Sequence, residues 1–424
     1  MTRPGPEFRW LWAAYAVSAY GSGLGFGAFS VVAIVALHAG AAQVAALSSA
    51  GLMIGALLAV PLGPWVEFRA KRPVMIAMDV ARFAALGSVP VAYALGVLTF
   101  AQLLTVSVIA AAGKIVFNAA SGAYLKTVVP AGSLLVATSR FESTTWSATI
   151  VGPPLGGAVV GLLGPVAGIG MDALSYLLSA LGVLAIRRPE APPPGHGARA
   201  GSRWSDIAQG WRYIAAHPVL RPLLANAAAV NALIMAGEPV LSVLMLARLH
   251  FPVWQYGLAF AVPCIGGLVG ARVAPRMAAR WGRPRVLHVF GALRACWPLG
   301  LAFVGPGAAG LAVVMVTELG LIFCCGVYNP VLAAYRLDAA GPERRARVLT
   351  AWSITTSLAI AVATAGWGLL AEVTGPRAAL AVAGLLLLAT PALLPRRIRP
   401  GSSGPDPRRT GPAGRGSDTL SARG

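Results

Sequence analysis

Four charged side chains interrupt long apolar stretches of this sequence and are its strongest candidates for chemistry. They are Lys114, Asp172, Glu238 and Glu318. Lys114 lies in the run "VIAAAGKIVFNAA" (108–120), and no other charged residue occurs between Arg82 and Lys126. A charge in an apolar interior is costly, so it usually faces a cavity or an opposite charge. The sequence therefore predicts a binding or ion-pairing role for these residues.

These residue types favour two kinds of chemistry. A lysine and a glutamate that face one cavity could bind polar groups of a small molecule, and a carboxylate in a water-poor cavity could take up and release a proton. We expect Lys114 and Glu318 to shape such a site, with Glu318 the better proton carrier and Glu238 the second candidate. A buried ion pair that only fixes helix packing is the alternative for both roles. Asp172 is expected to be mostly structural.

The elements that carry these residues are predicted to be transmembrane helices. The 424 residues are 57% hydrophobic and 11% charged, with a mean hydropathy of +0.72, whereas soluble proteins carry about 25% charged residues. No charged side chain occurs from Trp10 to Val66, and one span needs about 20 apolar residues. Most apolar segments are too long for barrel strands and lack two-residue alternation. The twelve segments are 10–37, 42–65, 73–97, 100–124, 139–163, 165–186, 220–247, 253–278, 284–304, 308–334, 348–371 and 376–395.

The basic residues predict the orientation. All but five of the 34 lysines and arginines lie in the termini, the central segment and every second loop. Because basic residues accumulate in cytoplasmic loops, we expect both termini to face the cytoplasm. The formal net charge of +20 is thereby explained by membrane topology. A nucleic-acid partner is not expected, since such proteins concentrate basic residues on one folded face.

The two halves of the chain repeat each other at a fixed offset of 211 residues. Three pairs show it: Arg72 and Arg283, Asn118 and Asn329, and Gly164 and Gly375, the glycines and arginines each followed by proline. This predicts an all-α integral membrane protein of twelve helices in two pseudo-symmetric six-helix bundles. The expected units are an N-terminal bundle (1–186), a cytoplasmic linker with an amphipathic helix (187–218), a C-terminal bundle (219–395) and a disordered basic tail (396–424).

With this repeat, the chain resembles the major facilitator superfamily. The loop "GPWVEFRAKRPV" (63–74) resembles that superfamily's conserved loop between spans 2 and 3, with Glu67 for its acid, Phe68 for its first arginine and Ala70 for a glycine. The resemblance implies a conformational lock at the cytoplasmic helix ends, extended by the following "MDVARF" (78–83). The residues assigned to this lock are Gly63, Glu67, Arg69, Lys71, Arg72, Asp79 and Arg82.

Other motifs are similar to the exporter branch that contains enterobactin and macrolide efflux-type proteins. These are "MDVARF" (78–83), the "GPPLGG" of the fifth span, "DALSYLLSALGVL" (172–184) and "DIAQGWRYIAAHPVLRPLL" (206–224). In the family's antiporters a similar fifth-span element is thought to limit leak and favour export, which the resemblance carries to Gly152, Pro153, Gly156 and Gly157. Tight helix packing is the alternative for these residues.

The resemblance also implies a central cavity lined by spans 1, 4, 7 and 10. Lys114, Glu238 and Glu318 lie on three of these spans. The repeat places position 114 opposite 325, seven residues beyond Glu318, which corresponds to roughly 10 Å of helix. A direct Lys114–Glu318 pair therefore stays one alternative, beside a state-dependent or substrate-bridged relation. The aromatic candidates for the cavity wall, which could equally belong to the core, are Tyr20, Phe117 and Tyr328.

The sequence and this resemblance thus predict a proton-coupled exporter of a hydrophobic or amphipathic small molecule in a bacterial cytoplasmic membrane. We expect the protein to be a monomer. An importer or uniporter, and more remotely a receptor or scaffold, are the alternatives. An enzyme is not expected, because the five histidines and four cysteines are scattered and form no metal-binding motif. An ATP-driven pump would need a separate subunit, because no phosphate-binding Gly-Lys-Ser/Thr loop occurs. Protons, the lipid bilayer and the substrate are the expected partners, with no cofactor and no metal.

Overall fold

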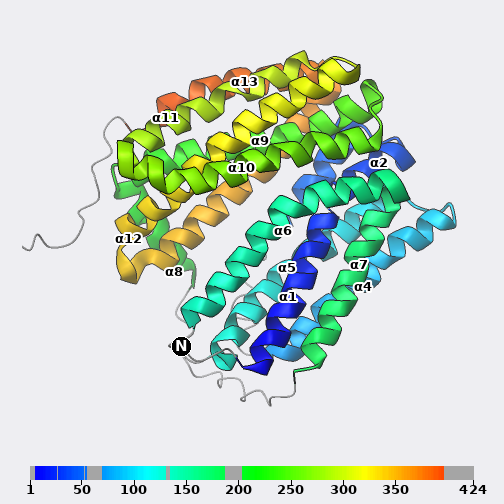
Figure 1. Cartoon of the computed structure of the whole chain (residues 1–424), viewed down its shortest axis with the longest axis horizontal. Coiled ribbons are helices and arrows are strands. Elements are labelled where there is room, and N and C mark those ends of the chain that lie inside the picture. Colours follow the sequence, from blue (N-terminus) through cyan, green and yellow to red (C-terminus); the bar gives the residue numbers. More distant parts are fainter. Residues whose placement is uncertain are drawn as a thin grey trace, which may run out of the picture.

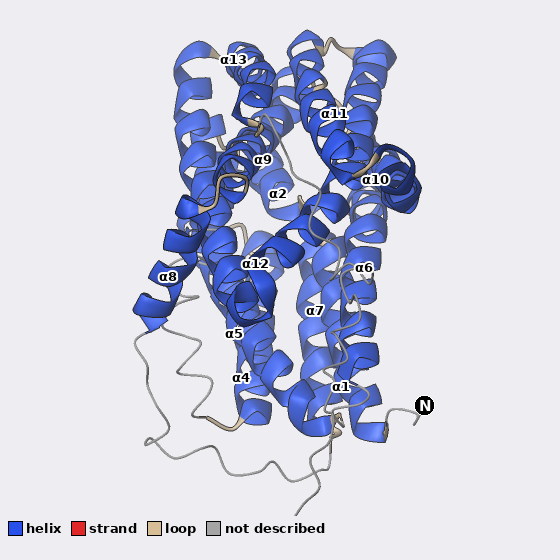
Figure 2. Ribbon diagram, turned by 90° about the vertical axis from the view of Figure 1, so that its left-hand side faces the viewer, coloured by secondary structure: helices blue, strands red, loops and turns tan. Residues whose placement is uncertain are grey.

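The computed structural model describes residues 5–25, 27–51, 53–54, 69–129, 134–186 and 203–395, and every regular element in these ranges is helical (Figures 1 and 2). Ten helices in the described part are long and apolar enough to cross a membrane. The all-helical membrane fold predicted from composition is thereby confirmed, while the number of twelve spans stays a prediction.

The first predicted span is broken in the structure. Helix α1 (Pro6–Leu24) ends within the glycine-rich stretch 21–27, and α2 (Ala28–Leu37) begins immediately after Gly27. Gly27 has a φ of 72°, a left-handed conformation that side chains other than glycine adopt with strain. The alternating glycines of this segment therefore permit a break, and a further helix begins at Ala41.

The next four helices follow the predicted spans closely. Their bounds are α4 (Lys71–Ala94), α5 (Phe100–Val128), α6 (Leu134–Leu163) and α7 (Pro165–Leu184). Proline at the first turn of α7 follows Gly164, whose φ is 91°. Pro376 follows Gly375 in the same way, with a φ of 87°. The two predicted repeat positions thus adopt the same local conformation.

The second half of the described chain begins with a short helix outside the spans. Its elements are α8 (Arg203–Ala216), α9 (Leu220–Val243) with a π-helical end η2 (Leu244–Arg248), α10 (Val253–Trp281), α11 (Arg283–Cys296), the 3₁₀ turn η3 (Pro298–Phe303), α12 (Gly307–Thr374), α13 (Pro376–Ala389) and the 3₁₀ turn η4 (Thr390–Leu393). Two predicted spans, 284–304 and 376–395, thus finish in tighter 3₁₀ turns.

Helix α12 corrects the expected loop at 336–347. The sequence separates two spans there, but the structure makes the whole segment helical, so that α12 has 68 residues. At 1.5 Å per residue this is about 100 Å, far more than a hydrocarbon core of about 30 Å. Only its two apolar stretches, Gly307–Ala340 and Arg347–Thr374, qualify as spans. The charged segment between them therefore joins two spans as helix.

The helices form two groups that meet at one end and diverge towards the other (Figure 1). Helices α1 and α4 to α7 pack mainly on one another, and α9 to α13 do the same. The groups touch through α6 and α10, and through α2 with α9 and η2. We call the end where they meet, formed by residues 37–45, 157–164, 248–257 and 368–377, the convergent end. Helix α8 and the beginning of α1 lie towards the opposite end.

Small residues allow the two groups to approach at the convergent end. A Cβ added to Gly157 of α6 would lie 2.5 Å from the Cα of Gly257 on α10. On α12, Glu372 accepts a hydrogen bond of 3.1 Å from the backbone N–H of Ala42. Gly40 leaves room for that carboxylate, because an added Cβ would lie 2.9 Å from its Oε1. Backbone contact and one charged hydrogen bond thus hold this end together.

Helix α8 packs on α12 through one face. Ile214 is buried there, and the Trp211 side chain donates a hydrogen bond of 3.0 Å to the hydroxyl of Thr355. The Tyr213 hydroxyl donates to the carbonyl of Ala339 at 2.6 Å. The amphipathic helix predicted within 187–218 is therefore present, and its packed face contacts protein.

We expect Gly157→Ala to shift the protein away from this arrangement, because the added methyl group would force the α6 and α10 backbones apart. Overpacking of this kind costs typically 1–3 kcal/mol. Distances between spin labels on Ala158 and Trp254 should then lengthen or broaden. Gly366→Ala is the matched control, because its added Cβ meets nothing within 4 Å. Unchanged distances in Gly157→Ala would contradict the prediction.

His217 is expected to make stability depend on pH. Its Nδ1 accepts hydrogen bonds from the backbone N–H groups of Val219 and Leu220 at 3.2 and 3.1 Å, which only the neutral ring can do. Partial burial lowers the pKa of His217 below its ordinary range. The unfolded chain therefore binds the proton more readily, and the contribution is complete above about pH 6.5 and lost as the pH falls through the lower folded pKa.

Thermal unfolding in detergent between pH 5 and pH 8 measures this effect. His217→Asn, which can still accept the hydrogen bonds but does not titrate, should flatten that part of the profile. A profile of the same slope in the variant would show that other groups cause the pH dependence.

Candidate functional site

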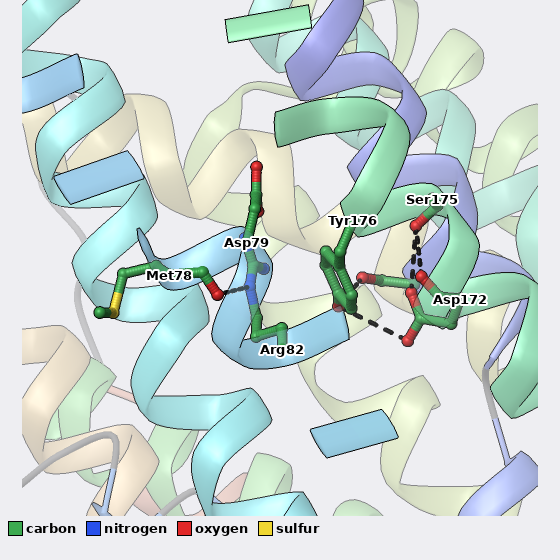
Figure 3. A network of polar contacts seen from close by, with 7 residues as sticks. Met78, Asp79, Arg82, Asp172, Ser175 and Tyr176 are labelled. Atoms are coloured by element: carbon green, nitrogen blue, oxygen red, sulfur yellow. Dashed lines mark hydrogen bonds and ion pairs between the residues drawn. The ribbon is translucent and has the colours of Figure 1, made fainter. Parts of the chain in front are cut away.

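A buried arginine organises the polar interior of the first group of helices. Arg82 of α4 is 1% exposed and forms an ion pair with Asp79, one turn earlier (Figure 3). Its guanidinium carbon lies 4.0 Å from the centre of the Tyr176 ring on α7 and 5.0 Å from the Phe117 ring on α5. Three helices thus contribute to the compensation of one cation.

Asp172 of α7 lies on the other side of Tyr176. The Tyr176 hydroxyl donates to the Asp172 carboxylate at 3.5 Å and shares a hydrogen bond of 2.8 Å with Ser22 of α1. Gly25 packs on this carboxylate, because an added Cβ would lie 3.1 Å from Oδ2. The break between α1 and α2 therefore adjoins a buried acid.

Lys114 has Asp172, not Glu318, as an electrostatic neighbour. Asp172 interacts with both Lys114 and Arg82, whereas the described residues include no hydrogen bond or ion pair between Lys114 and Glu318. Lys114 is exposed on α5, next to Gly113, which packs against the aliphatic part of Arg82. The lone lysine therefore joins the border of the Arg82–Asp172 group, and the direct Lys114–Glu318 alternative is not present in this conformation.

The second group of helices contains a counterpart of Arg82 with a neutral partner. The guanidinium carbon of Arg294 on α11 lies 3.8 Å from the Tyr328 ring on α12. Its Nη2 donates a hydrogen bond of 2.6 Å to Asn226 of α9, whose amide donates to the carbonyl of Thr390 at 2.8 Å. Both arginines thus lie on an aromatic ring, but only Arg82 pairs with a carboxylate in the described part.

Glu238 and Glu318 form a separate acidic site. Ser242 and Tyr256 donate to the Glu238 carboxylate at 3.3 and 3.4 Å, and Glu238 interacts electrostatically with Glu318 of α12. No lysine or arginine among the described residues forms an ion pair with either acid. The Tyr256 hydroxyl would lie 3.5 Å from a Cβ at Gly27. This site therefore touches the same α1–α2 break as Asp172, from the opposite group.

The predicted cavity aromatics pack against other side chains in this conformation. Phe117 and Tyr328 are buried and pack against arginines inside the two groups, which agrees with the alternative of a core position, while a role in the cavity wall stays a prediction. Tyr20 bonds to Ser147 at 2.7 Å and lines an apolar groove between α1 and α7 with Leu174. Each of the three aromatic side chains therefore packs inside a helix group or between neighbouring helices in this conformation.

The predicted lock residues do not form one cluster in the described part. Gly63 and Glu67 lie outside the described residues. Arg72 at the start of α4 donates to the carbonyls of Val183 and Leu184 at 3.2 and 2.8 Å, and thereby binds the last turn of α7. Two further members, Arg69 and Lys71, adjoin it in the chain, but Asp79 and Arg82 belong to the buried group described above.

The fifth-span motif contacts both neighbours of α6. An added Cβ at Gly23 of α1 would lie 2.9 Å from the Cα of Gly152. Gly156 packs on the carbonyl of Leu24, and Gly157 contacts α10. The side chain of Pro153 lies outside the described part. Close packing is thus a role that these glycines perform, at the α1–α2 break and between the groups.

Comparison with known proteins identifies the family of this chain. The family model described as Major Facilitator Superfamily matches residues 11–324. This chain belongs to the Major Facilitator Superfamily. It is 29% identical to "Multidrug efflux pump Tap" of Mycobacterium tuberculosis over 371 residues, which cover 85% of both chains. It is 27% identical to the Tap of Mycolicibacterium fortuitum over 93% of this chain and 97% of the other. The superfamily assignment and the resemblance to its exporters are confirmed.

Solved structures agree in fold. The nucleoside transporter NupG superposes with a TM-score of 0.70 over 92% of this chain and 98% of its own, at 13% identity. An identity this low supports the shared architecture only. Together with the ten membrane-capable helices, the superfamily membership makes the chain a multi-pass transporter of the cell membrane.

Several residues of these sites were not found from the sequence. Tyr176, Asn226 and Tyr256 lie in apolar runs in which a tyrosine or asparagine is unremarkable. The sequence contains a signal for one feature of these sites, the aromatic ring that covers an arginine in each half. Phe117 and Tyr328 are separated by the repeat offset of 211 residues. That offset marks them as equivalent positions, although it does not show that each ring covers an arginine. Among the described residues no group of histidines, cysteines and acids could hold a metal ion.

We expect Arg82→Gln to destabilise the transporter more than Arg294→Gln. Removing Arg82 leaves Asp79 buried without its partner, which costs about 3–5 kcal/mol. Removing Arg294 breaks a hydrogen bond to a neutral amide, at about 1–3 kcal/mol. Denaturant unfolding in mixed micelles measures both.

A double variant tests whether the unpaired carboxylate causes the loss. Asp79→Asn combined with Arg82→Gln should recover part of the stability lost in Arg82→Gln. Equal losses for the two arginine variants, or no recovery in the double variant, would contradict a charge-based role for Arg82.

Proposed function

We propose that this superfamily member is a proton-coupled exporter of hydrophobic or amphipathic small molecules. The observation that carries the proposal is the acidic site of Glu238 and Glu318, which lies inside spans and has no ion-paired cation among the described residues. A carboxylate in such a place can bind and release a proton without first breaking a salt bridge. Similarity to Tap over 85% of both chains supports export.

The proposed architecture is twelve spans in two six-helix bundles, 1–186 and 219–395, joined by the linker 187–218 and followed by the tail 396–424. Both termini face the cytoplasm in this proposal, because most basic residues of the described part lie towards the end opposite the convergent end, and basic residues accumulate on the cytoplasmic side. The closed convergent end then faces outward, and the site is reached from the cytoplasm. Alternating access would open the convergent end by separating Gly157 from Gly257 and Glu372 from Ala42.

The acidic site of Glu238 and Glu318 and the Arg82–Asp172 group have different roles in this proposal. Glu318 carries the proton, and Glu238 shares it through the interaction between the two carboxylates. Lys114 and Asp172 contribute to substrate binding on the opposite group of helices, where Lys114 is exposed. Because both sites touch the α1–α2 break, movement at Gly25 and Gly27 couples them. The fifth-span residues Gly152, Pro153, Gly156 and Gly157 maintain the close approach of the helices around this break.

Proton movement in proteoliposomes tests the proposal. Vesicles with an acidic lumen and an internal pH dye would receive a panel of hydrophobic antibiotics and dyes. We expect added compounds to raise the lumenal pH in the wild type, and Glu318→Gln to reduce this signal to background because an amide carries no proton. Asp338→Asn is the matched control, since Asp338 is an exposed carboxylate on the same helix.

Two outcomes would count against parts of the proposal. A full signal in both Glu318→Gln and Glu238→Gln would remove the acidic site from the proton path. Accumulation of labelled compound without any proton movement would favour a uniporter. In the Lys114→Ala variant we expect a raised half-saturating compound concentration with intact coupling, because Lys114 is placed in substrate binding and not in proton transfer.

A further inference from the structure

A pocket between α8 and α12 gathers arginines from two distant parts of the chain. It has a volume of about 220 Å³ and is lined by Arg212 and Tyr213 of α8 and by Arg344 and Arg347 of α12. These pairs are more than 130 residues apart in sequence. None of the lining residues that the structure describes carries a carboxylate. The described lining of the pocket therefore contributes basic and no acidic side chains.

Contacts around the pocket hold these side chains in place. Arg347 donates a hydrogen bond of 2.8 Å to Oε1 of Gln209, and the guanidinium carbon of Arg344 lies 5.3 Å from the Tyr213 ring. Gly210 allows α8 to approach closely, because it packs on the backbone carbonyl of Arg347. The walls of the pocket are thus built from packed helices, and its shape does not depend on a loop.

The accumulation of basic residues in cytoplasmic segments does not by itself explain this pocket. That tendency places arginines near the membrane surface without requiring them to converge. Guanidinium groups repel one another at short distance, so their convergence on one concavity is favourable when an anion occupies it. Arginine also matches the geometry of phosphate oxygens, to which it can donate two parallel hydrogen bonds.

We propose that Arg212, Arg344 and Arg347 form a binding site for a phosphate group. Two sources share this chemistry: the headgroup of an anionic phospholipid and free inorganic phosphate. The position at the junction of a linker helix with the start of the span Arg347–Thr374 places the pocket at headgroup depth. A bound headgroup would tie α8, which precedes the second group of helices, to α12. This inference does not depend on the transported substrate or on proton coupling.

Native mass spectrometry of the delipidated full-length protein tests the lipid source. We expect phosphatidylglycerol to bind more tightly than phosphatidylcholine, and the double variant Arg212→Gln/Arg344→Gln to bind it roughly thirtyfold more weakly. This corresponds to about 1 kcal/mol for each arginine near an anionic headgroup. Arg276→Gln/Arg280→Gln is the matched control, since it removes two exposed charges from α10 on the same side of the protein.

Thermal stability tests the free-phosphate source. Millimolar inorganic phosphate, compared with chloride at equal ionic strength, should raise the unfolding temperature of the wild type and the control but not of the double variant if free phosphate is the ligand. Loss of lipid binding alone assigns the site to headgroups, and loss of phosphate stabilisation alone assigns it to free phosphate. Either result supports the site.

The proposal is overturned if the double variant and the control lose lipid affinity equally, or if neither ligand distinguishes them. Equal loss would mean that the arginines act only through general charge attraction. The single variant Arg212→Gln separates a loss of binding from a loss of folding, because Arg212 is exposed and the substitution removes no described packing contact. It should fold like the wild type and show an intermediate loss of affinity.

Discussion

A guanidinium group inside a membrane protein needs both negative charge and close contacts, and Arg82 obtains them from its own helix and from two others. Asp79 supplies the charge, while Tyr176 and Phe117 cover the planar faces. Gly113 is small enough to let α5 approach the side chain. Since these partners lie on α4, α5 and α7, satisfying one cation fixes the relative positions of three helices. Tyr176 then links that group to Asp172 and α1.

The second half also buries an arginine, but its described side-chain partner is neutral. Arg294 also lies on a ring, that of Tyr328, but its described side-chain partner is the amide of Asn226. The acids of the second half lie elsewhere: Glu238 accepts a hydrogen bond from Tyr256 of α10, and Glu318 interacts with Glu238. A repeated architecture has thus kept a stacked arginine in both halves while the carboxylates differ. This asymmetry separates a charge-paired group, which favours fixed packing, from an acidic site that is free of ion pairs in the described part.

The break between α1 and α2 connects these two groups. Gly25 packs on Asp172 and Gly27 packs near Tyr256, so one short segment contacts the polar interior of both halves. The neighbouring contacts of Gly23 with α6 and of Gly157 with α10 involve backbone atoms. Packed backbones cannot deform gradually, because any separation loses many contacts together. A change of backbone conformation at this break would therefore move whole helices.

Local properties of the sequence were sufficient to predict the class of fold, most helix positions of the described part and the candidate charges. Hydropathy depends only on composition within about 20 residues, and a charge in an apolar run is visible wherever it faces. The repeat offset likewise identified Gly164 and Gly375, whose backbones adopt the same conformation. The helical joint within α12 was missed, because polar residues between two spans are compatible with either a loop or a helix.

Tertiary structure alone decided which side chains meet. Lys114 and Glu318 looked like partners because both are isolated charges, yet the electrostatic neighbour of Lys114 is Asp172 and that of Glu318 is Glu238. Phe117 looked like a cavity residue and covers Arg82 instead. Such pairings depend on the rotation and depth of each helix, which are set by packing against several neighbours at once. The sequence determined that these charges lie within the membrane, and only the packing of the helices decided what each one faces.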